Sequence, residues 1–262
     1  MSENIHIVAA SAQHTHTVIF LHGRGSNARE FASEFFESQA SDGQFITEIF
    51  PGFKWVYPCA TIRHAETEDE DMHQWFDMAF IWEIMRKEAE EVGGMNKVIL
   101  AGISQGCATA IIALLAGGAR VAAFIGFSSW LPFEQEILHI ATEAFTIKAD
   151  PVKGIRNLLF PNEHPGPGFP DCGSNVSQVP VLVEHAEDDD TVPFQNGAML
   201  RDGLRALGMR IDWQQYTDGG HWVNEPQGID DMARFVTKCL ARSSKRGLST
   251  VVDSRDEIQP AS

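Results

Sequence analysis

The chain has 262 residues, of which 44% are hydrophobic, and this is enough apolar material for one sizeable core. Its net charge of −16 argues against a nucleic-acid partner and against adhesion to an anionic membrane. The cysteines lie far apart and show neither metal nor disulfide spacing; they are Cys59, Cys107, Cys172 and Cys239. There is no signal-peptide pattern and no apolar run of membrane-spanning length, so we expect reduced thiols and a cytoplasmic location.

Short apolar runs alternate along the chain with stretches of helical periodicity. We predict strands at residues 17–22, 54–57, 98–101, 122–127, 179–185 and 211–216. We predict helices at residues 28–40, 75–92, 105–116, 194–207 and 226–242. This alternation indicates an α/β fold with a mainly parallel central sheet that is covered by helices on both faces.

Two segments interrupt the alternation. Residues 133–178 form a long connection with a predicted helix at 134–144, a further helical turn near 155–159 and a loop rich in proline and glycine. Such an insertion in a compact domain is typical of a lid or a pocket-shaping segment. Residues 243–262 are polar with little periodicity, so we predict a disordered tail there and assign residues 1–242 to one domain.

The run from Val98 to Gly106 contains the pattern Gly-x-Ser-x-Gly between a predicted strand and a predicted apolar helix. This is the sequence form of a nucleophile elbow, in which a tight turn exposes the serine hydroxyl at the top of a sheet. Glycines two residues to either side prevent side chains from colliding across the turn. Ser104 is therefore the predicted nucleophile of a serine hydrolase with the α/β-hydrolase fold.

A serine nucleophile needs a base that removes its proton and an acid that orients the base. In α/β-hydrolases both follow the serine along the chain, on loops after later strands. His221 follows the last predicted strand in a loop with two preceding glycines, and we predict that it is the base. The acid is expected after the preceding strand, where composition alone leaves open Glu187, Asp188, Asp189 and Asp190. A metal site is the rival interpretation of this acidic cluster.

Acyl transfer also needs hydrogen-bond donors for the oxyanion of the tetrahedral intermediate. The backbone N–H of Gln105, directly after the nucleophile, is one expected donor. The other is expected on the loop after an early strand, where the segment from His22 to Gly25 reads His-Gly-Arg-Gly. We predict the backbone N–H of Arg24 as this second donor.

With these pieces in place, the chain resembles the acyl-protein thioesterase/carboxylesterase (phospholipase/carboxylesterase) family of α/β-hydrolases. The resemblance rests on blocks that stand in the family's order. These blocks are Phe20-Leu-His-Gly-Arg-Gly25, Trp75-Phe-Asp77, Gly102-Ile-Ser-Gln-Gly106, Phe127-Ser-Ser-Trp-Leu-Pro132 and His185-Ala-Glu-Asp-Asp-Asp-Thr-Val-Pro193.

The resemblance implies that Asp189 is the acid and that His221 is the base. It also implies that Trp75, Phe76, Trp130 and Leu131 lie near an apolar acyl-binding surface, with packing in the core as the alternative, above all for Phe76.

The chain departs from the family pattern at several places. Cys107 and Ala186 stand where the family usually has glycine, and the 133–178 connection is longer than the family's linker. These departures leave the identity of the substrate open, while the proposed serine, aspartate and histidine are all present.

The sequence therefore predicts a hydrolase that cleaves carboxylic esters or thioesters through an acyl-enzyme and requires no metal or cofactor. Its expected partner is an acyl ester or thioester substrate, either a small molecule or an S-acylated protein, and no nucleic acid. The alternatives are an esterase for a small metabolite, an inactive binding protein with this fold, and a metal-dependent hydrolase.

Overall fold

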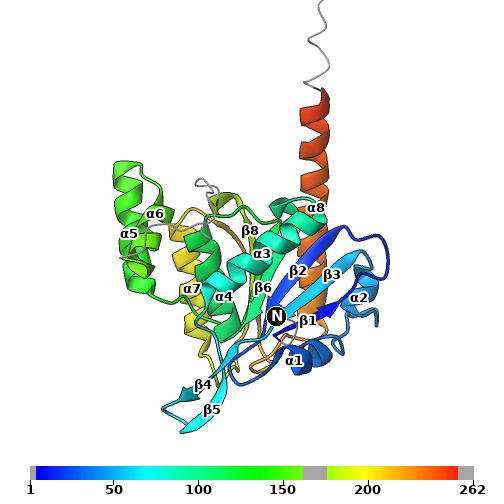
Figure 1. Cartoon of the computed structure of the whole chain (residues 1–262), viewed down its shortest axis with the longest axis horizontal. Coiled ribbons are helices and arrows are strands. Elements are labelled where there is room, and N and C mark those ends of the chain that lie inside the picture. Colours follow the sequence, from blue (N-terminus) through cyan, green and yellow to red (C-terminus); the bar gives the residue numbers. More distant parts are fainter. Residues whose placement is uncertain (1–3, 162–175, 253–262) are drawn as a thin grey trace, which may run out of the picture.

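The computed structural model describes residues 4–161 and 176–252, and in them one large sheet forms the centre of the molecule (Figure 1). The order of its strands is β1-β3-β2-β6-β7-β8-β9. The strands are β1 (Ile5–Val8), β2 (His16–Leu21), β3 (Phe53–Pro58), β6 (Val98–Ile103), β7 (Ala123–Phe127), β8 (Pro180–Ala186) and β9 (Arg210–Tyr216). Only β1 in this sheet is antiparallel to its neighbour, so the predicted, mainly parallel sheet is confirmed.

Helices cover both faces of the sheet, because successive side chains of each buried strand point to opposite sides. In β2, Ile19 and Leu21 belong to one apolar cluster, while Val18 and Phe20 belong to the other. The first cluster includes residues of α3 (Met78–Val92), α4 (Gln105–Gly117), α5 (Glu134–Ile147), α6 (Pro151–Leu159) and α7 (Phe194–Ala206). The second includes residues of α1 (Ala28–Phe35), α2 (Ile46–Ile49) and α8 (Gln227–Val252). Short 3₁₀ turns precede β6 at Met95–Lys97 and β8 at Val176–Gln178.

A two-stranded hairpin, β4 (Thr61–Ala65) and β5 (Glu70–Gln74), lies outside the large sheet and was not predicted from the sequence. Its strands are short and largely exposed, so they lack the apolar alternation that marks a strand packed on a core. In Figure 1 the hairpin projects from the body of the molecule. The predicted helix at 75–92 begins only at Met78, because Asp77 caps it by accepting a hydrogen bond from the Phe80 N–H at 3.1 Å.

The described part of the 133–178 connection consists mainly of α5 and α6, which lie beside α7 and α4 (Figure 1). The Arg156 guanidinium of α6 donates hydrogen bonds to the backbone carbonyls of Ala116 and Gly117 at the end of α4. Ser104 lies at the opposite end of α4, roughly 18 Å away along a helix of 13 residues. Residues 162–175, which contain the predicted proline- and glycine-rich loop, lie outside the described residues.

The last helix, α8, continues to Val252 and so includes residues 243–252, for which we had predicted disorder. Elongating an existing helix costs far less than starting one, so a helix that begins on the sheet can extend through a polar segment. Residues 253–262 lie outside the described part of the chain.

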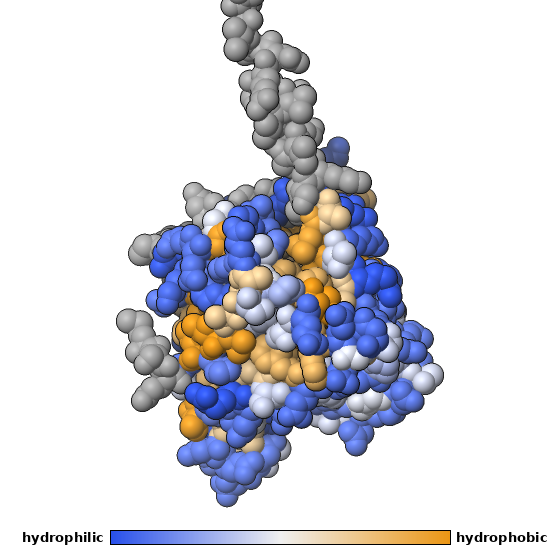
Figure 2. Space-filling view, turned by 90° about the vertical axis from the view of Figure 1, so that its right-hand side faces the viewer, coloured by the Kyte–Doolittle hydropathy of each residue, from blue (hydrophilic) through white to orange (hydrophobic). Residues whose placement is uncertain are grey.

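The surface of the molecule mixes polar and apolar side chains. Figure 2 shows the side on which the β1 edge of the sheet lies, where orange apolar areas interrupt the blue polar surface. Ile7 of β1 is one of the exposed large apolar residues. No helix within residues 4–161 and 176–252 is long and apolar enough to span a membrane.

Candidate active site

Ser104 occupies the turn between β6 and α4 in a backbone conformation that non-glycine residues rarely adopt, with φ 55° and ψ −128°. The turn is tight enough to exclude side chains at both flanking glycines. A Cβ atom on Gly102 would lie 2.5 Å from the backbone nitrogen of Cys107, and one on Gly106 would lie 2.3 Å from the carbonyl oxygen of His22. This geometry is that of a nucleophile elbow, as the sequence predicted.

The steric role of Gly106 gives a testable expectation. Gly106→Ala should lower the free energy of unfolding by about 3 kcal/mol or more, because the new methyl group meets backbone atoms that cannot rotate away. Urea denaturation of the purified variant measures this change. Gly23→Ala is the matched control, since a Cβ there makes only ordinary contacts, the nearest at 3.6 Å from Ser104 Cβ. Equal stability of the two variants would contradict the account of the elbow.

Asp189 and His221 form a hydrogen-bonded pair on the loops that follow β8 and β9. His221 Nδ1 lies 2.9 Å from Asp189 Oδ2 and 3.1 Å from Asp189 Oδ1. The backbone N–H groups of Thr191 and Val192 also donate to Asp189 Oδ1, at 3.0 and 2.8 Å. The carboxylate side chain is fully buried, whereas the imidazole is 23% exposed. The imidazole is therefore held by Nδ1, which leaves Nε2 to accept a proton.

The three neighbouring carboxylates, which composition could not distinguish from Asp189, have other partners. Asp188 accepts a hydrogen bond from the Gly220 N–H, Glu187 from the Gln215 amide, and Asp190 from the Thr191 hydroxyl. In the described part of the chain no group of three or more His, Cys, Asp or Glu side chains could hold a metal ion. Asp189 is thus the carboxylate of this loop that the fold brings to His221.

Ser104, Asp189 and His221 lie on one edge of the sheet, because each follows the carboxyl end of a parallel strand. The serines after β7 connect the elbow to the histidine loop: Ser129 Oγ donates to the Ser104 carbonyl at 2.8 Å, and Ser128 Oγ to the Trp222 carbonyl at 3.5 Å. Within the described residues Ser104 Oγ and His221 form no direct hydrogen bond. Such bonds are often long until a substrate binds.

The loop after β2 is held next to Ser104 by a ring of hydrogen bonds. The Ala60 N–H donates to His22 Nε2 at 3.0 Å, and His22 Nδ1 donates to the Gly23 carbonyl at 2.7 Å. The Gly25 N–H donates to the His73 carbonyl at 3.0 Å, and His73 Nδ1 donates to the Ala60 carbonyl at 2.6 Å. The intervening Arg24 N–H has no acceptor among the described residues. Gln105 begins α4, where backbone N–H groups lack intrahelical acceptors.

His22 predicts a dependence of stability on pH. Burial lowers the pKa of His22 to about 4, and its Nε2 must stay unprotonated to accept the Ala60 N–H. As pH falls from 6.5, the unfolded chain takes up a proton that the folded chain excludes. The free energy of unfolding should therefore fall by about 2 kcal/mol from this residue between pH 7 and pH 5.

Urea midpoints at pH 7 and pH 5 measure this effect. The loss should be smaller in His22→Gln and unchanged in His139→Gln, which replaces an exposed histidine of α5. An equal loss in His22→Gln and the wild type would contradict this assignment. Burial also lowers the pKa of His16 to about 4, so part of the acid sensitivity should remain in the His22 variant.

The acidic run at residues 66–71 turns the β4–β5 hairpin and contacts the loop after β2. The Arg24 guanidinium donates to both carboxylate oxygens of Glu68, at 2.8 and 2.6 Å, and to Gln74 Oε1 at 3.3 Å. These contacts connect the hairpin to the loop after β2. Because this ion pair is about one-third exposed, its contribution to stability is small.

The four residues implied to lie at an apolar surface occupy different environments. Trp75 is only 4% exposed and donates its indole N–H to the His22 carbonyl at 2.8 Å, so it braces the loop after β2. Leu131 is buried against Gly203 of α7, and Trp130 is half-buried. Phe76, for which core packing was the alternative, is 62% exposed beneath the Arg63 guanidinium.

His185 is a residue near the site that sequence reasoning did not single out. Its Nε2 donates to the Val192 carbonyl at 2.8 Å and lies 3.3 Å from Asp189 Oδ2, with both side chains fully buried. Burial lowers the pKa of His185, which favours the neutral ring. His185 thus lies against the same carboxylate oxygen of Asp189 as His221 does. The sequence signal that could have identified His185 is its position four residues before Asp189, in the same sequence block.

Two family models match the chain. The model of the Prolyl oligopeptidase family matches residues 73–243, and that of the Phospholipase/Carboxylesterase family matches residues 2–92. The acyl-protein thioesterase 1 of Gibberella zeae is 24% identical over 89% of this chain and 94% of its own length. A relative from Oryza sativa, named as a probable inactive carboxylesterase, is 26% identical over 88% of this chain and 87% of its own length.

Solved structures share the fold. The crystal structure of Zea mays acyl-protein thioesterase 2 aligns with a TM-score of 0.65 and 20% identity, covering 90% of this chain and 98% of that chain. The Bacillus cereus carboxylesterase aligns with a TM-score of 0.58 and 12% identity, covering 91% of this chain and 95% of that chain. The chain has the α/β-hydrolase fold and belongs to the prolyl oligopeptidase family, whose model matches residues 73–243, while its residues 2–92 are similar to the phospholipase/carboxylesterase family.

Proposed function

We propose that the protein hydrolyses carboxylic esters or thioesters with Ser104, His221 and Asp189 as its catalytic triad. The observation that supports this most strongly is the buried Asp189 carboxylate bound to His221 Nδ1, on the sheet edge where Ser104 occupies its strained turn. This arrangement joins a nucleophile, a base and an orienting acid in the chain order of α/β-hydrolases. The intact set argues against the inactive binding protein, although one relative carries such a name.

In the proposed mechanism, Ser104 Oγ attacks the acyl carbon while His221 Nε2 takes the serine proton. Asp189 keeps the other ring nitrogen protonated and stabilises the imidazolium that forms. The backbone N–H groups of Arg24 and Gln105 donate to the oxyanion, since neither has an acceptor in the described chain. His221 then protonates the leaving oxygen or sulfur, and water releases the acyl group by the same steps in reverse.

For the substrate, we propose a thioester or ester of an apolar acyl chain, as in S-acylated proteins. The names of relatives such as the Gibberella zeae acyl-protein thioesterase support this choice. Two exposed apolar side chains, Ile62 of β4 at 59% and Phe76 just after β5 at 62%, offer a surface that could receive an acyl chain. An ester of a small metabolite is the second candidate substrate. The long connection that contains α5 and α6 favours this candidate, because it changes the outline of the domain.

A substrate panel tests this proposal. Purified protein is assayed with oxygen esters and thioesters of matched acyl chains from short to long, and with an S-palmitoyl peptide. We expect turnover of both ester classes, with kcat/KM rising with acyl length and no loss in the presence of a chelator. Turnover that falls with acyl length would favour the small-metabolite esterase. Turnover abolished by the chelator and restored by a metal ion would instead identify a metal-dependent hydrolase.

A further inference from the structure

The two proposed oxyanion donors belong to separate segments of the chain. The Arg24 N–H lies on the loop after β2, and the Gln105 N–H lies in the first turn of α4. Donors stabilise an oxyanion only when they are held close to the place where its charge develops, and a displacement of about 1 Å can cost about a hundredfold in rate. The proposed reaction therefore requires contacts that fix the loop relative to α4.

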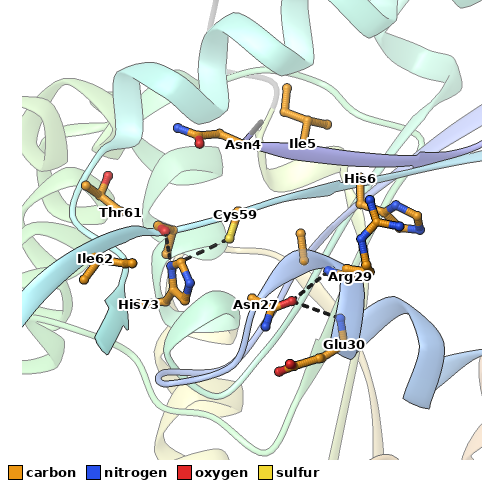
Figure 3. A pocket seen from close by; sticks show the side chains of 12 residues that line it. Asn4, Ile5, His6, Asn27, Arg29, Glu30, Cys59, Thr61, Ile62 and His73 are labelled. Carbon is orange, nitrogen blue, oxygen red and sulfur yellow. Dashed lines mark hydrogen bonds between the residues drawn. The ribbon is translucent and has the colours of Figure 1, made fainter. Parts of the chain in front are cut away.

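The end of this loop borders a pocket of about 820 Å³ (Figure 3). The lining of the pocket includes Asn27, which follows the loop, and also Ala60 and His73. The Ala60 N–H donates to His22 Nε2, and the His73 carbonyl accepts a hydrogen bond from the loop as well, so both tie the loop to the region of the β4–β5 hairpin. Because the pocket lies beside these residues, the position of the loop on this side depends on hydrogen bonds more than on packing.

Trp75, the residue after β5, ties the same loop to α4 by two further hydrogen bonds. Its backbone N–H donates to Gln105 Oε1 at 3.0 Å, and its indole N–H donates to the His22 carbonyl at 2.8 Å. The first bond is partly buried and the second is buried, so water competes weakly with both. We call this path, from Gln105 through Trp75 to His22, the Trp75 brace.

The Trp75 brace reaches both oxyanion donors within a short stretch of chain. Gln105 carries one donor itself, and His22 stands two residues before Arg24 in the loop. The rings of His22 and Trp75 also contact each other, with their centroids 5.0 Å apart. Because the two hydrogen bonds act in series, the loss of either one disconnects the loop from α4 along this path.

We propose that Trp75 and the side chain of Gln105 are positioning residues, which set the spacing between the Arg24 and Gln105 N–H donors. In this role they act through the backbone donors and not on the acyl group itself. The effect on turnover rests on the proposed function, whereas the hold on the loop rests on the hydrogen bonds alone.

The test uses the full chain with Gln105→Met, Trp75→Phe and the two substitutions combined. Methionine is close to glutamine in length but has no carbonyl oxygen, and phenylalanine keeps an aromatic ring without the indole N–H. Gln105 is partly exposed, so its variant should fold even if Trp75→Phe does not, and it tests the first bond alone.

Trp82→Phe is the matched control for Trp75→Phe. Trp82 of α3 is 6% exposed, and its indole N–H also donates to a backbone carbonyl, that of Ala113, at 2.8 Å. This control therefore loses a buried hydrogen bond of the same kind at a place outside the Trp75 brace.

The value of kcat/KM is measured for an oxygen ester and for the matching thionoester, in which a weakly accepting sulfur replaces the carbonyl oxygen. We expect kcat/KM for the oxygen ester to fall by about tenfold to a hundredfold in each single variant, and that for the thionoester by less than about threefold. The combined variant should stay within about twofold of the single variants, since the bonds act in series. Trp82→Phe should leave the ratio of the two substrates unchanged.

Amide hydrogen exchange follows the loop without any turnover. Exchange at residues 22–26 should be at least about threefold faster in the brace variants than in the wild type, and unchanged in Trp82→Phe.

The other outcomes contradict the proposal in distinct ways. Equal losses for the oxygen ester and the thionoester would show a general effect on the fold and would overturn the positioning role. Additive losses in the combined variant would overturn the single path through Trp75. Unchanged exchange at residues 22–26 would overturn the hold on the loop. A folded wild type that turns over neither substrate would contradict the proposed function, while the exchange measurement would still decide whether Trp75 and Gln105 hold the loop.

Discussion

Ser104→Ala is expected to lower kcat for ester and thioester substrates by about 10⁴-fold to 10⁶-fold, because the substitution removes the hydroxyl that attacks the acyl carbon in the proposed mechanism. Binding should change little, since the substitution removes a single oxygen atom. Steady-state kinetics with a chromogenic ester, at enzyme concentrations high enough to detect residual turnover, measures the effect.

The loss in Ser104→Ala should not come from unfolding. Ser104 Oγ makes no hydrogen bond with His221 in the described chain, and alanine is smaller than serine, so the urea midpoint should remain near that of the wild type. Ser11→Ala is a suitable control, because Ser11 is an exposed serine whose hydroxyl donates to the Pro51 carbonyl. Its kcat should equal that of the wild type. A Ser104→Ala variant within tenfold of wild-type kcat would contradict the proposed mechanism.

Asp189→Asn is expected to lower kcat by about 10⁴-fold at neutral pH. The amide that replaces the carboxylate can donate to His221 Nδ1, which favours the tautomer with the proton on Nε2, and this nitrogen then cannot accept the serine proton. The loss of negative charge also destabilises the imidazolium. Kinetics with the same ester, measured across pH, report the effect.

Asp190→Asn is the matched control for Asp189→Asn. Asp190 is the next residue, is exposed, and accepts a hydrogen bond from the Thr191 hydroxyl rather than from His221. Its kcat should stay within about twofold of the wild type, as for surface substitutions generally. Similar losses in the two variants would show that the charge of the loop matters and that the pairing of Asp189 with His221 does not.

The elements that the sequence predicted well are those buried on the central sheet. β6 is a continuous apolar run, β2 is apolar from Val18 to Leu21, and α4 is apolar on nearly all sides, because each packs against a neighbouring layer. β4 and β5 were not predicted because they pair with each other and do not pack on the core. Most of their residues are therefore polar and exposed, and they lack the apolar alternation of a buried strand. The end of α8 was misplaced because helix elongation needs no apolar face.

The sequence predicted those parts of the candidate site whose local backbone geometry requires particular residue types. The glycines around Ser104 indicate the elbow, since any side chain there would meet backbone atoms. Composition could not identify the acid among residues 187–190, because that choice depends on which carboxylate the turn after β8 directs to His221. The family resemblance, and not the local sequence pattern, indicated Asp189. The support from His185 and the bracing by Trp75 arise from contacts between distant segments, which spacing alone does not reveal.

The central claim, that Ser104 is an activated nucleophile, is tested most directly by labelling with a fluorophosphonate, which forms a covalent bond with the serine of an intact triad. Mass spectrometry of the labelled wild-type protein should find one adduct, on the peptide that contains Ser104, and none in Ser104→Ala. Labelling should slow strongly in Asp189→Asn, where His221 no longer accepts the proton. A wild-type protein that is folded but takes up no label, or an adduct that persists in Ser104→Ala, would contradict the claim.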